Sequence, residues 1–503
     1  MIYLALHESS EMGGMLLQLF SEYLKELIKK KGMTVSSLSR LSGVERTTLS
    51  KVLTGQRVLP YDSLELLAYH LRLTLNEEER FRQYYDMQFE KGENLRAREM
   101  ISELFADLAN LNFSAPAFEE TRLLMSLNAY AGGRSIFSGN TNVQPLLRGV
   151  LAEEIARTDA RVELTVPPSA AFINDEILRL YLNGKTPAIT QITMFASVGM
   201  PDEISIHNLG CFQKILPVCL LSAQKYHPYY YYEETDRTKY MDPFPYFLLT
   251  HTCVVCLSED CTQAMLLRKE DQVSQYHRHF QMLLSRCRSL IQYTSNPLEI
   301  LNAYQTCTDS DGFYMIMDQP CFGRFYTEEA VNQFCREELP FYEQIVEAAQ
   351  RRFRLLRSVE KFYTLFSASG IQRFAETGTL DDYPVAVVSP FPLEWRIQLL
   401  RKMAEGIRSG EVTGRLLEHG VFPDYLSMCT SRESGVGFFT TEQFPLTEGL
   451  CSVQIREPGL CQAFHDWLIH LPGGEKVLST EETADFLKAT ADRLAAEERG
   501  SKK

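Results

Sequence analysis

Apolar residues recur three or four positions apart through the first 75 residues, a period that predicts short amphipathic helices. The first predicted helix covers residues 16–31, and two shorter ones cover 34–42 and 45–53. A fourth follows Pro60. The residues expected to face inward are Leu17, Phe20, Leu24, Leu27, Ile28, Leu38, Leu41, Leu49, Val52, Leu53, Leu64, Leu67, Ala68 and Leu71.

The two short helices have recognisable ends. Thr34 is a suitable N-cap because its hydroxyl can accept a hydrogen bond from a free backbone N–H. Gly43 can take the positive φ that a tight turn needs, and Gly55 can end the second helix. The outer face of that helix then consists of polar side chains able to reach base edges and phosphates, namely Glu45, Arg46, Thr47, Ser50 and Lys51.

Residues 16–75 resemble the helix-turn-helix of the Cro/phage-repressor (XRE) family, because the helix lengths, Gly43, Gly55 and Pro60 all fall in register. The resemblance implies a double-stranded DNA operator as partner, read in the major groove. It assigns base contacts to Arg46, Thr47 and Lys51. The full set expected to bind DNA is Thr34, Glu45, Arg46, Thr47, Ser50, Lys51 and Arg57.

Two positions depart from the family pattern. Val35 stands where a phosphate-binding glutamine is usual, and Arg57 is the sole basic residue of a loop that is usually basic. Both departures weaken the binding of one head to DNA phosphates, so we expect two heads to bind together as a homodimer. The alternative is an ordinary helical hairpin.

The pattern changes beyond residue 75. Residues 76–111 continue as helices with an aromatic stripe, which indicates a connector or a dimer contact. Strand-like alternation at 135–138 and 161–166 flanks a helical stretch at 143–156, a βαβ pattern. Further on we expect helices at 173–183, 206–223 and 271–290, and strands at 245–257 and 264–267.

Two internal echoes suggest duplication. Residues 252–280 resemble 436–464 at a constant offset of 184 positions, and 146–155 resemble 399–407, each after a short strand ending in serine (Ser138, Ser389). The predicted fold is an all-α N-terminal helix-turn-helix domain followed by a large α/β (mixed α+β) region with two similar halves. The expected boundaries are a leader at 1–14, the helix-turn-helix domain at 15–75, a helical connector at 76–124, half one at 125–300, a helical bridge at 301–354, half two at 355–495 and a tail at 496–503.

Duplicated α/β halves are similar to the phospholipase-D-like architecture. That family's catalytic His-x-Lys signature is missing here, so the resemblance implies a sensor without catalysis. A phosphate-binding glycine loop, a dinucleotide fingerprint and a Gly-x-Ser-x-Gly elbow are also missing from the sequence, so we expect no enzyme activity.

Charge separates the two regions. The 503-residue chain has a net charge of −14, yet residues 16–75 carry nine Lys or Arg against five Asp or Glu. A basic head on an acidic body fits a protein whose head alone approaches DNA. The sequence contains neither an apolar run long enough to span a membrane nor a signal-peptide pattern, and its twelve cysteines are scattered, so we expect a cytoplasmic protein with no membrane partner.

Two clusters invite other chemistry. His251, Cys253, Cys256 and Cys261 can bind metal or cycle as a dithiol, but alternation along a strand points them to different faces, so we expect buried cysteines, no metal and no cofactor. The run 226–232 contains five tyrosines that form either a ligand pocket or an aromatic cover for the core. Residues 309–312 look like a turn rather than a calcium loop.

Together these patterns predict a transcriptional regulator. Two heads would sit about 34 Å apart on DNA, set by a body that senses a small molecule, peptide or protein effector. The alternatives are a helical-repeat peptide sensor, a DNA-binding head fused to an enzyme, and a head that serves only as an interaction module.

Overall fold

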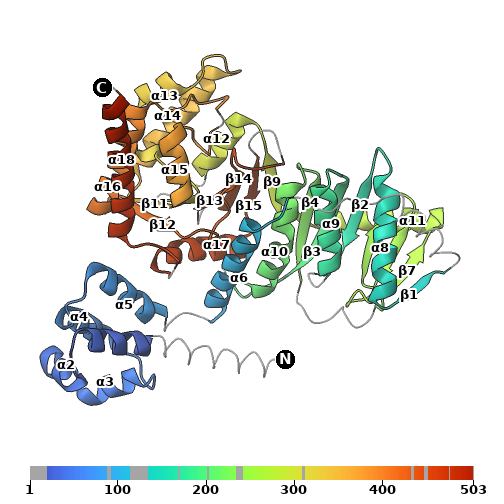
Figure 1. Cartoon of the computed structure of the whole chain (residues 1–503). Helices are drawn as coiled ribbons and strands as arrows, with labels where there is room; N and C mark the ends of the chain where they lie inside the picture. Colours follow the sequence, from blue (N-terminus) through green and yellow to red (C-terminus); the bar gives the residue numbers. More distant parts are fainter. Residues whose placement is uncertain are drawn as a thin grey trace.

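The computed structural model describes residues 20–87, 92–113, 134–167, 170–200, 203–233, 242–306, 308, 312–383, 385–431, 435–446, 451–474 and 476–501. The expected leader and the aspartates at 309 and 311 lie outside them. We call residues 20–87 the head and residues 92–501 the body (Figure 1). Within the described residues, every helix is too short or too polar to cross a lipid bilayer.

The head is a five-helix unit. A helix at 20–30 is followed by α2 (Val35–Ser42), α3 (Arg46–Leu53), α4 (Tyr61–His70) and α5 (Leu75–Met87). The predicted inner face is confirmed for the described residues except Leu41, which is 52% exposed while Ser42 is buried in its place, and Leu17 lies outside the described residues. Phe81 of α5 packs on Phe20, with ring centroids 5.1 Å apart, so the aromatic stripe expected in a connector completes the core of the head.

The first body sheet has eight strands in the order β1-β7-β6-β5-β2-β3-β4-β8. Strands β2, β3 and β4 are parallel, and every other pairing in this sheet is antiparallel. The strands are β1 (Ile136–Ser138), β2 (Arg161–Thr165), β3 (Ala188–Ala196), β4 (Tyr226–Glu233), β5 (Tyr246–Leu249), β6 (Val254–Leu257), β7 (Gln263–Leu267) and β8 (Arg288–Ser289). The helices are α8 (Asn140–Ile155), α9 (Ala171–Leu182), α10 (Ile206–Leu221) and α11 (Glu270–Leu284).

The second sheet has seven strands in the order β12-β11-β10-β13-β14-β15-β9. Here β10, β11 and β12 are parallel and the other pairs antiparallel. The strands are β9 (Ile291–Thr294), β10 (Gly312–Met317), β11 (Lys361–Ser367), β12 (Thr413–Leu417), β13 (Leu426–Ser431), β14 (Gly435–Thr440) and β15 (Ser452–Ile455). The helical elements are α12 (Pro297–Thr306), η1 (Gly323–Phe325), α13 (Glu328–Phe334), α14 (Tyr342–Ser358), α15 (Ala368–Thr377), α16 (Leu393–Ser409), α17 (Pro458–His470), η2 (Leu471–Gly473) and α18 (Thr480–Ser501).

The two sheets share one connectivity. In each, three parallel strands are followed by a three-strand antiparallel meander, and the strand that precedes the unit pairs with the last strand of that meander. The final edge also corresponds, because β8 pairs with β4 and Val477 bridges to Leu417 of β12. The echo at a 184-residue offset therefore relates equivalent elements, β6-β7-α11 and β14-β15-α17. The other echo is wrong, since α8 precedes the first parallel strand whereas α16 lies between the second and third.

Several element predictions need correction. Residues 245–257 form the hairpin β5–β6 rather than one strand. Residues 135–166 do not form the expected βαβ unit, because β1 and β2 are not neighbours in the sheet. The parallel βαβ units are β2-α9-β3 and β3-α10-β4. The expected helical bridge contains strand β10, and the expected tail continues α18 to Ser501. Two sheets also exclude a helical-repeat body.

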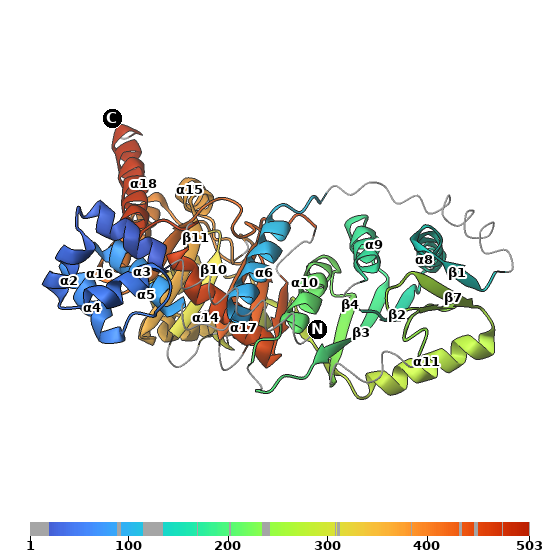
Figure 2. The same cartoon turned by 90° about the horizontal axis from the view of Figure 1, so that it is seen from below.

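Helix α6 (Gly92–Ala109) joins the two halves. It lies between α10 of the first half and α17 of the second (Figure 2). Tyr425 donates a hydrogen bond to the carbonyl of Leu108 at 2.6 Å, and Gln213 donates to the carbonyl of Met100 at 2.6 Å. Because α6 contacts both halves, it is an integral part of the body rather than a free connector.

Candidate nucleic-acid interface

The turn between α2 and α3 is defined by local hydrogen bonds. The Thr34 hydroxyl accepts from the Ser37 backbone N–H at 3.1 Å, and the Thr34 backbone N–H donates to the Ser37 hydroxyl at 2.9 Å, a reciprocal capping box. Gly43 ends α2 with φ of 75°, and its N–H donates to the Ser39 carbonyl at 3.0 Å. A β-carbon at that φ is strained, so glycine suits this turn.

Helix α3 divides into two faces. Thr48, Leu49, Val52 and Leu53 are buried against the head core. The predicted contact residues Glu45, Arg46, Thr47, Ser50 and Lys51 are all exposed. Within the described part of the chain, Arg46 and Lys51 form no ion pair, so both cations are available to an external partner.

The remaining predicted residues are partly engaged. The Thr34 hydroxyl serves the capping box. Arg57 is exposed and donates from a terminal guanidinium nitrogen to the Thr48 hydroxyl at 3.4 Å, and the Thr47 hydroxyl donates to Glu45 Oε2 at 3.3 Å. This contact turns the Arg57 side chain toward Thr48 of α3.

Arg40 belongs to the same surface but was absent from the predicted set. It lies in the last turn of α2, is exposed, and forms no ion pair with the described residues. Its position three residues before Gly43, on the polar side of α2, could have identified it.

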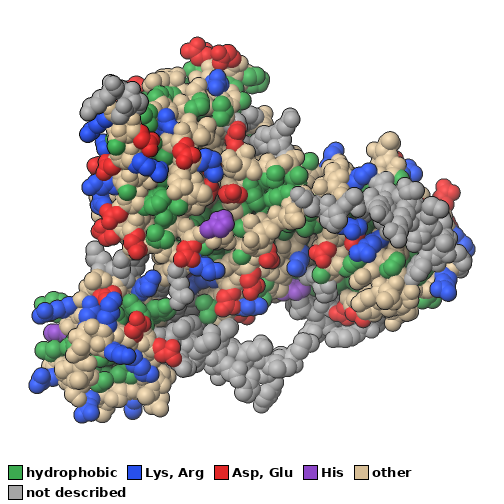
Figure 3. Space-filling view, in the orientation of Figure 1, with side chains coloured by type: hydrophobic (Ala, Val, Ile, Leu, Met, Phe, Trp, Pro, Cys, Tyr) green, Lys and Arg blue, Asp and Glu red, His purple; other side chains and the backbone are tan. Residues whose placement is uncertain are grey.

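The head presents this face away from the body. In Figure 1, α2 and α3 lie on the far side of the head, whereas α5 lies toward the body, and Figure 3 shows Lys and Arg around the outer edge of the head. Between head and body is a cavity of about 330 Å³, lined on the head side by Tyr23, Lys30, Glu77 and Arg80 and on the body side by residues that include Glu482. The α3 face is thus clear of the body.

Glu77 organises the inner side of the head. Its carboxylate lies 2.9 Å from Lys30 Nζ and 2.6 Å from Lys31 Nζ. Burial alone would raise the pKa of Glu77, but hydrogen bonds from Lys31, the Thr74 backbone and Lys30 lower this pKa to about 2. Lys30 and Lys31 are therefore paired within the head itself.

Comparison with known proteins decides the nature of this unit. A family model described as the Cro/C1-type HTH DNA-binding domain matches residues 23–77. Residues 23–77 are a Cro/C1-type helix-turn-helix DNA-binding domain. The resemblance is confirmed over residues 23–75, and the match places a DNA-binding domain in the head.

No curated protein matches the chain in sequence. A solved structure, the polyphosphate kinase from Porphyromonas gingivalis, is 11% identical over 70% of this chain, with a TM-score of 0.20. The chain spans 54% of that protein's length. A TM-score this low does not show that the body shares the fold of that protein.

The cysteine cluster is spread over both faces of the first sheet. Cys253 packs in the main core, whereas Cys256 lies in the smaller core under α11 and donates to the Tyr276 hydroxyl at 3.2 Å. Burial raises the pKa of both thiols. Among the described residues, no three His, Cys, Asp or Glu side chains are grouped to hold a metal ion.

The tyrosine run forms strand β4. Tyr226 and Tyr230 are buried in the main core, and Tyr229 and Tyr231 pack against the core under α11. The tyrosine side chains therefore lie on both faces of strand β4. Tyr231 also lines a cavity of about 330 Å³ with His207 and His279.

Proposed function

We propose that this protein is a sequence-specific transcriptional regulator that reads an operator with α3 and senses an effector with its body. The observation that carries the proposal is the exposed polar edge of α3 formed by Arg46, Thr47 and Lys51, in which Arg46 and Lys51 form no ion pair with the described residues. Arginine and lysine side chains there can reach the acceptor edge of guanine.

We infer that the protein works as a homodimer. One head offers few phosphate contacts, since Val35 is apolar and Arg57 is the only cation of its loop, so two heads are needed for useful affinity. Helix α4 supports this inference because it exposes two large apolar side chains three residues apart, Leu66 at 44% and Tyr69 at 78%. Such residues suit contact with a second copy.

The body would act by binding rather than by catalysis. Helix α6 contacts both halves, and only residues 88–91 separate it from α5 of the head. A change in the orientation of one half relative to the other would therefore move the DNA-binding head of each subunit. An effector, whether a small molecule, peptide or protein, shifts DNA affinity only if it binds one arrangement better than the other.

Selection from a random pool of DNA duplexes by the full chain tests the proposal. We expect enrichment of one sequence, arranged as two half-sites about one helical turn apart, ~34 Å. A single enriched half-site would contradict the proposed homodimer. No enrichment, with binding equally strong to every duplex, would overturn sequence-specific regulation.

A further inference from the structure

A fully buried arginine lies near the carboxyl end of strand β10. Arg352 of α14 is 1% exposed, and neither its Nε nor its Nη2 has a hydrogen-bond partner among the described residues. An arginine side chain stays charged at any physiological pH. A buried charge with two unsatisfied N–H groups is costly unless something fills the vacancy.

The protein satisfies this guanidinium only in part. Nη1 donates to the Tyr383 hydroxyl, and the group lies over the Tyr304 ring, 4.2 Å from its centroid. The nearest carboxylate, Asp382, is 4.0 Å from Nη1, too far for a hydrogen bond. Burial raises the pKa of Asp382 to about 6, so at neutral pH this carboxyl is mostly ionised and balances the charge of Arg352, but it accepts no hydrogen bond from Nε or Nη2.

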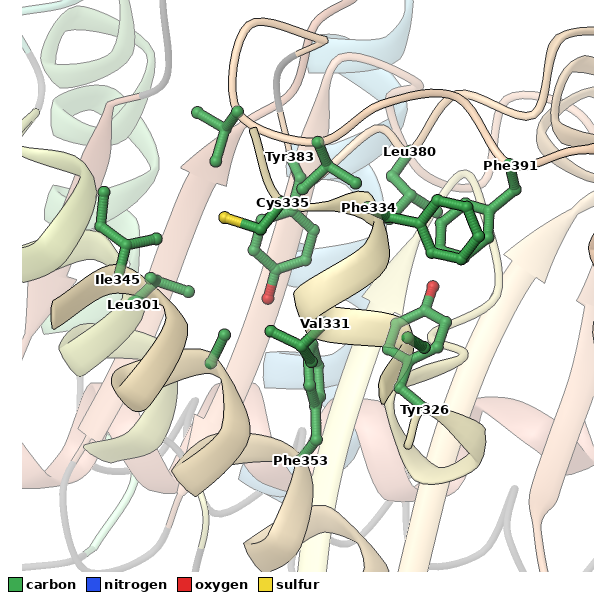
Figure 4. Close-up of a pocket in the computed structure, with 14 residues that line it drawn as sticks. Leu301, Tyr326, Val331, Phe334, Cys335, Ile345, Phe353, Leu380, Tyr383 and Phe391 are labelled. Atoms are coloured by element: carbon green, nitrogen blue, oxygen red, sulfur yellow. The ribbon is translucent and has the colours of Figure 1, made fainter. Parts of the chain in front are cut away.

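An apolar pocket lies between α13 and α14, and Figure 4 shows side chains that line it. It encloses about 50 Å³, and its walls are apolar. Helices α12, α13 and α14 supply most of the walls, together with Leu380, Tyr383, Val387, Val388 and Phe391. An apolar recess suits the hydrocarbon part of a small ligand, and a long chain must extend through its mouth or widen it.

The pocket adjoins a second, smaller hollow that contains Arg352. The two share Tyr326, Phe353, Leu380 and Tyr383 as walls. The hollow beside the guanidinium holds about 10 Å³, room for one water, so a carboxylate must push its walls apart to reach Nε and Nη2. Ligands of α/β sheets commonly bind beyond the carboxyl ends of parallel strands, as here.

We propose that this pocket binds a monocarboxylate with an apolar body, such as a medium-chain fatty acid, whose carboxylate pairs with Arg352. The two vacant donors, Nε and Nη2, lie on one edge of the guanidinium and match the two oxygens of a carboxylate. A dianion such as phosphate fits less well, because among the described residues Arg352 is the only cation lining the smaller hollow, none lines the apolar pocket, and Asp382 lies beside Arg352.

The inference names the effector class of the proposed regulator, but binding itself does not require DNA. Suitable probes are decanoate, its uncharged analogue decanol, and acetate, which lacks the chain. Trp395 lies 5.2 Å from Phe334 of the pocket wall, ring centroid to centroid, so tryptophan fluorescence can report binding alongside calorimetry. We expect decanoate to bind at least tenfold more tightly than decanol, and acetate not to bind measurably.

Three variants of α14 separate charge from shape. Arg352→Gln should lower decanoate affinity at least tenfold and leave decanol unchanged. Ala349→Phe fills the apolar pocket and should abolish binding of both. Arg351→Gln removes the same charge from the exposed neighbouring position and should change neither.

Equal affinity for decanol and decanoate, or decanoate binding that survives Ala349→Phe, would overturn the proposal. If Arg352→Gln does not fold, the decanoate–decanol difference and Ala349→Phe still decide it. The same titrations with operator DNA separate the two claims. Decanoate binding without any change in DNA affinity keeps the site but removes its regulatory role. Absence of sequence-specific DNA binding both with and without decanoate contradicts the proposed function and leaves the site intact.

Discussion

Arg98 on α6 donates through Nε to Asp466 on α17 at 2.7 Å, across 368 positions of sequence, and both side chains are largely buried. The Trp467 indole N–H donates to the Ser102 hydroxyl at 2.9 Å in the same interface. The helix that follows the DNA-binding domain is therefore held in the body by polar contacts as well as by Phe105, which packs on Trp467 with ring centroids 4.9 Å apart.

Removal of this ion pair should loosen α6. We expect Arg98→Ala to lower the free energy of unfolding of the body by about 3–5 kcal/mol, because the buried Asp466 carboxylate loses its guanidinium partner and keeps, among the described residues, the His470 ring at 3.5 Å. Denaturant unfolding measures this change. Arg96→Ala, which breaks an exposed pair with Glu99, is the control and should cost under about 1 kcal/mol. Equal losses of unfolding free energy in the two variants would show that the Arg98–Asp466 pair stabilises the body no more than an exposed pair.

The role of Thr34 as a helix cap can be separated from a role in DNA binding. Thr34→Ala should destabilise the head by about 1 kcal/mol, since Ser37 N–H loses its acceptor, while Thr34→Ser retains the cap. Thermal unfolding of the head, followed beside DNA titration, tests this. A loss of DNA affinity in Thr34→Ser without loss of stability would instead assign the methyl group a contact with DNA.

The buried acid beside Arg352 predicts a pH dependence. The pKa of Asp382, raised by burial to about 6, exceeds its unfolded value of about 3.9. The folded protein thus binds the proton more tightly than the unfolded chain, so this stability is fully present below pH 4 and is lost as pH rises through 6.

Asp382→Asn should remove that part of the slope, up to about 3 kcal/mol between pH 4 and 7. Unfolding free energies of both proteins at pH 4.5, 5.5 and 7 measure it. Some slope will remain, because burial also raises the pKa of Asp381, to about 7. An unchanged slope in the variant would mean that Asp382 does not titrate in this range.

The head was predictable because its signals are local. Thr34, Gly43, Leu49 and Val52 each fix a cap, a turn or a buried face within one or two helical turns. Leu41 was the exception. Ser42 takes the buried position because its hydroxyl donates to the Leu38 carbonyl at 2.8 Å, so it needs no water, and spacing alone does not reveal this bond.

The body was predictable only in parts. Strand-turn-strand units such as β14–β15 are local, and their repetition was visible in the sequence. The pairing of β1 with β7 joins residues more than 120 positions apart, which hydrophobic periodicity does not encode. Arg352 was missed because it reads as part of a charged run, although it falls in the apolar stripe of Ala348, Ala349 and Leu356. Its burial depends on Tyr304 and Tyr383 from other elements.

The most direct test of the central claim is the affinity of the full chain for its selected operator, compared with that of Arg46→Ala, Lys51→Ala and the control Lys25→Ala, which removes an exposed cation from the first helix of the head. If α3 reads the operator, Arg46→Ala and Lys51→Ala should each weaken specific binding by about 1–3 kcal/mol and relax sequence preference, while Lys25→Ala changes little. Unchanged affinity and unchanged footprints in both α3 variants would contradict the account.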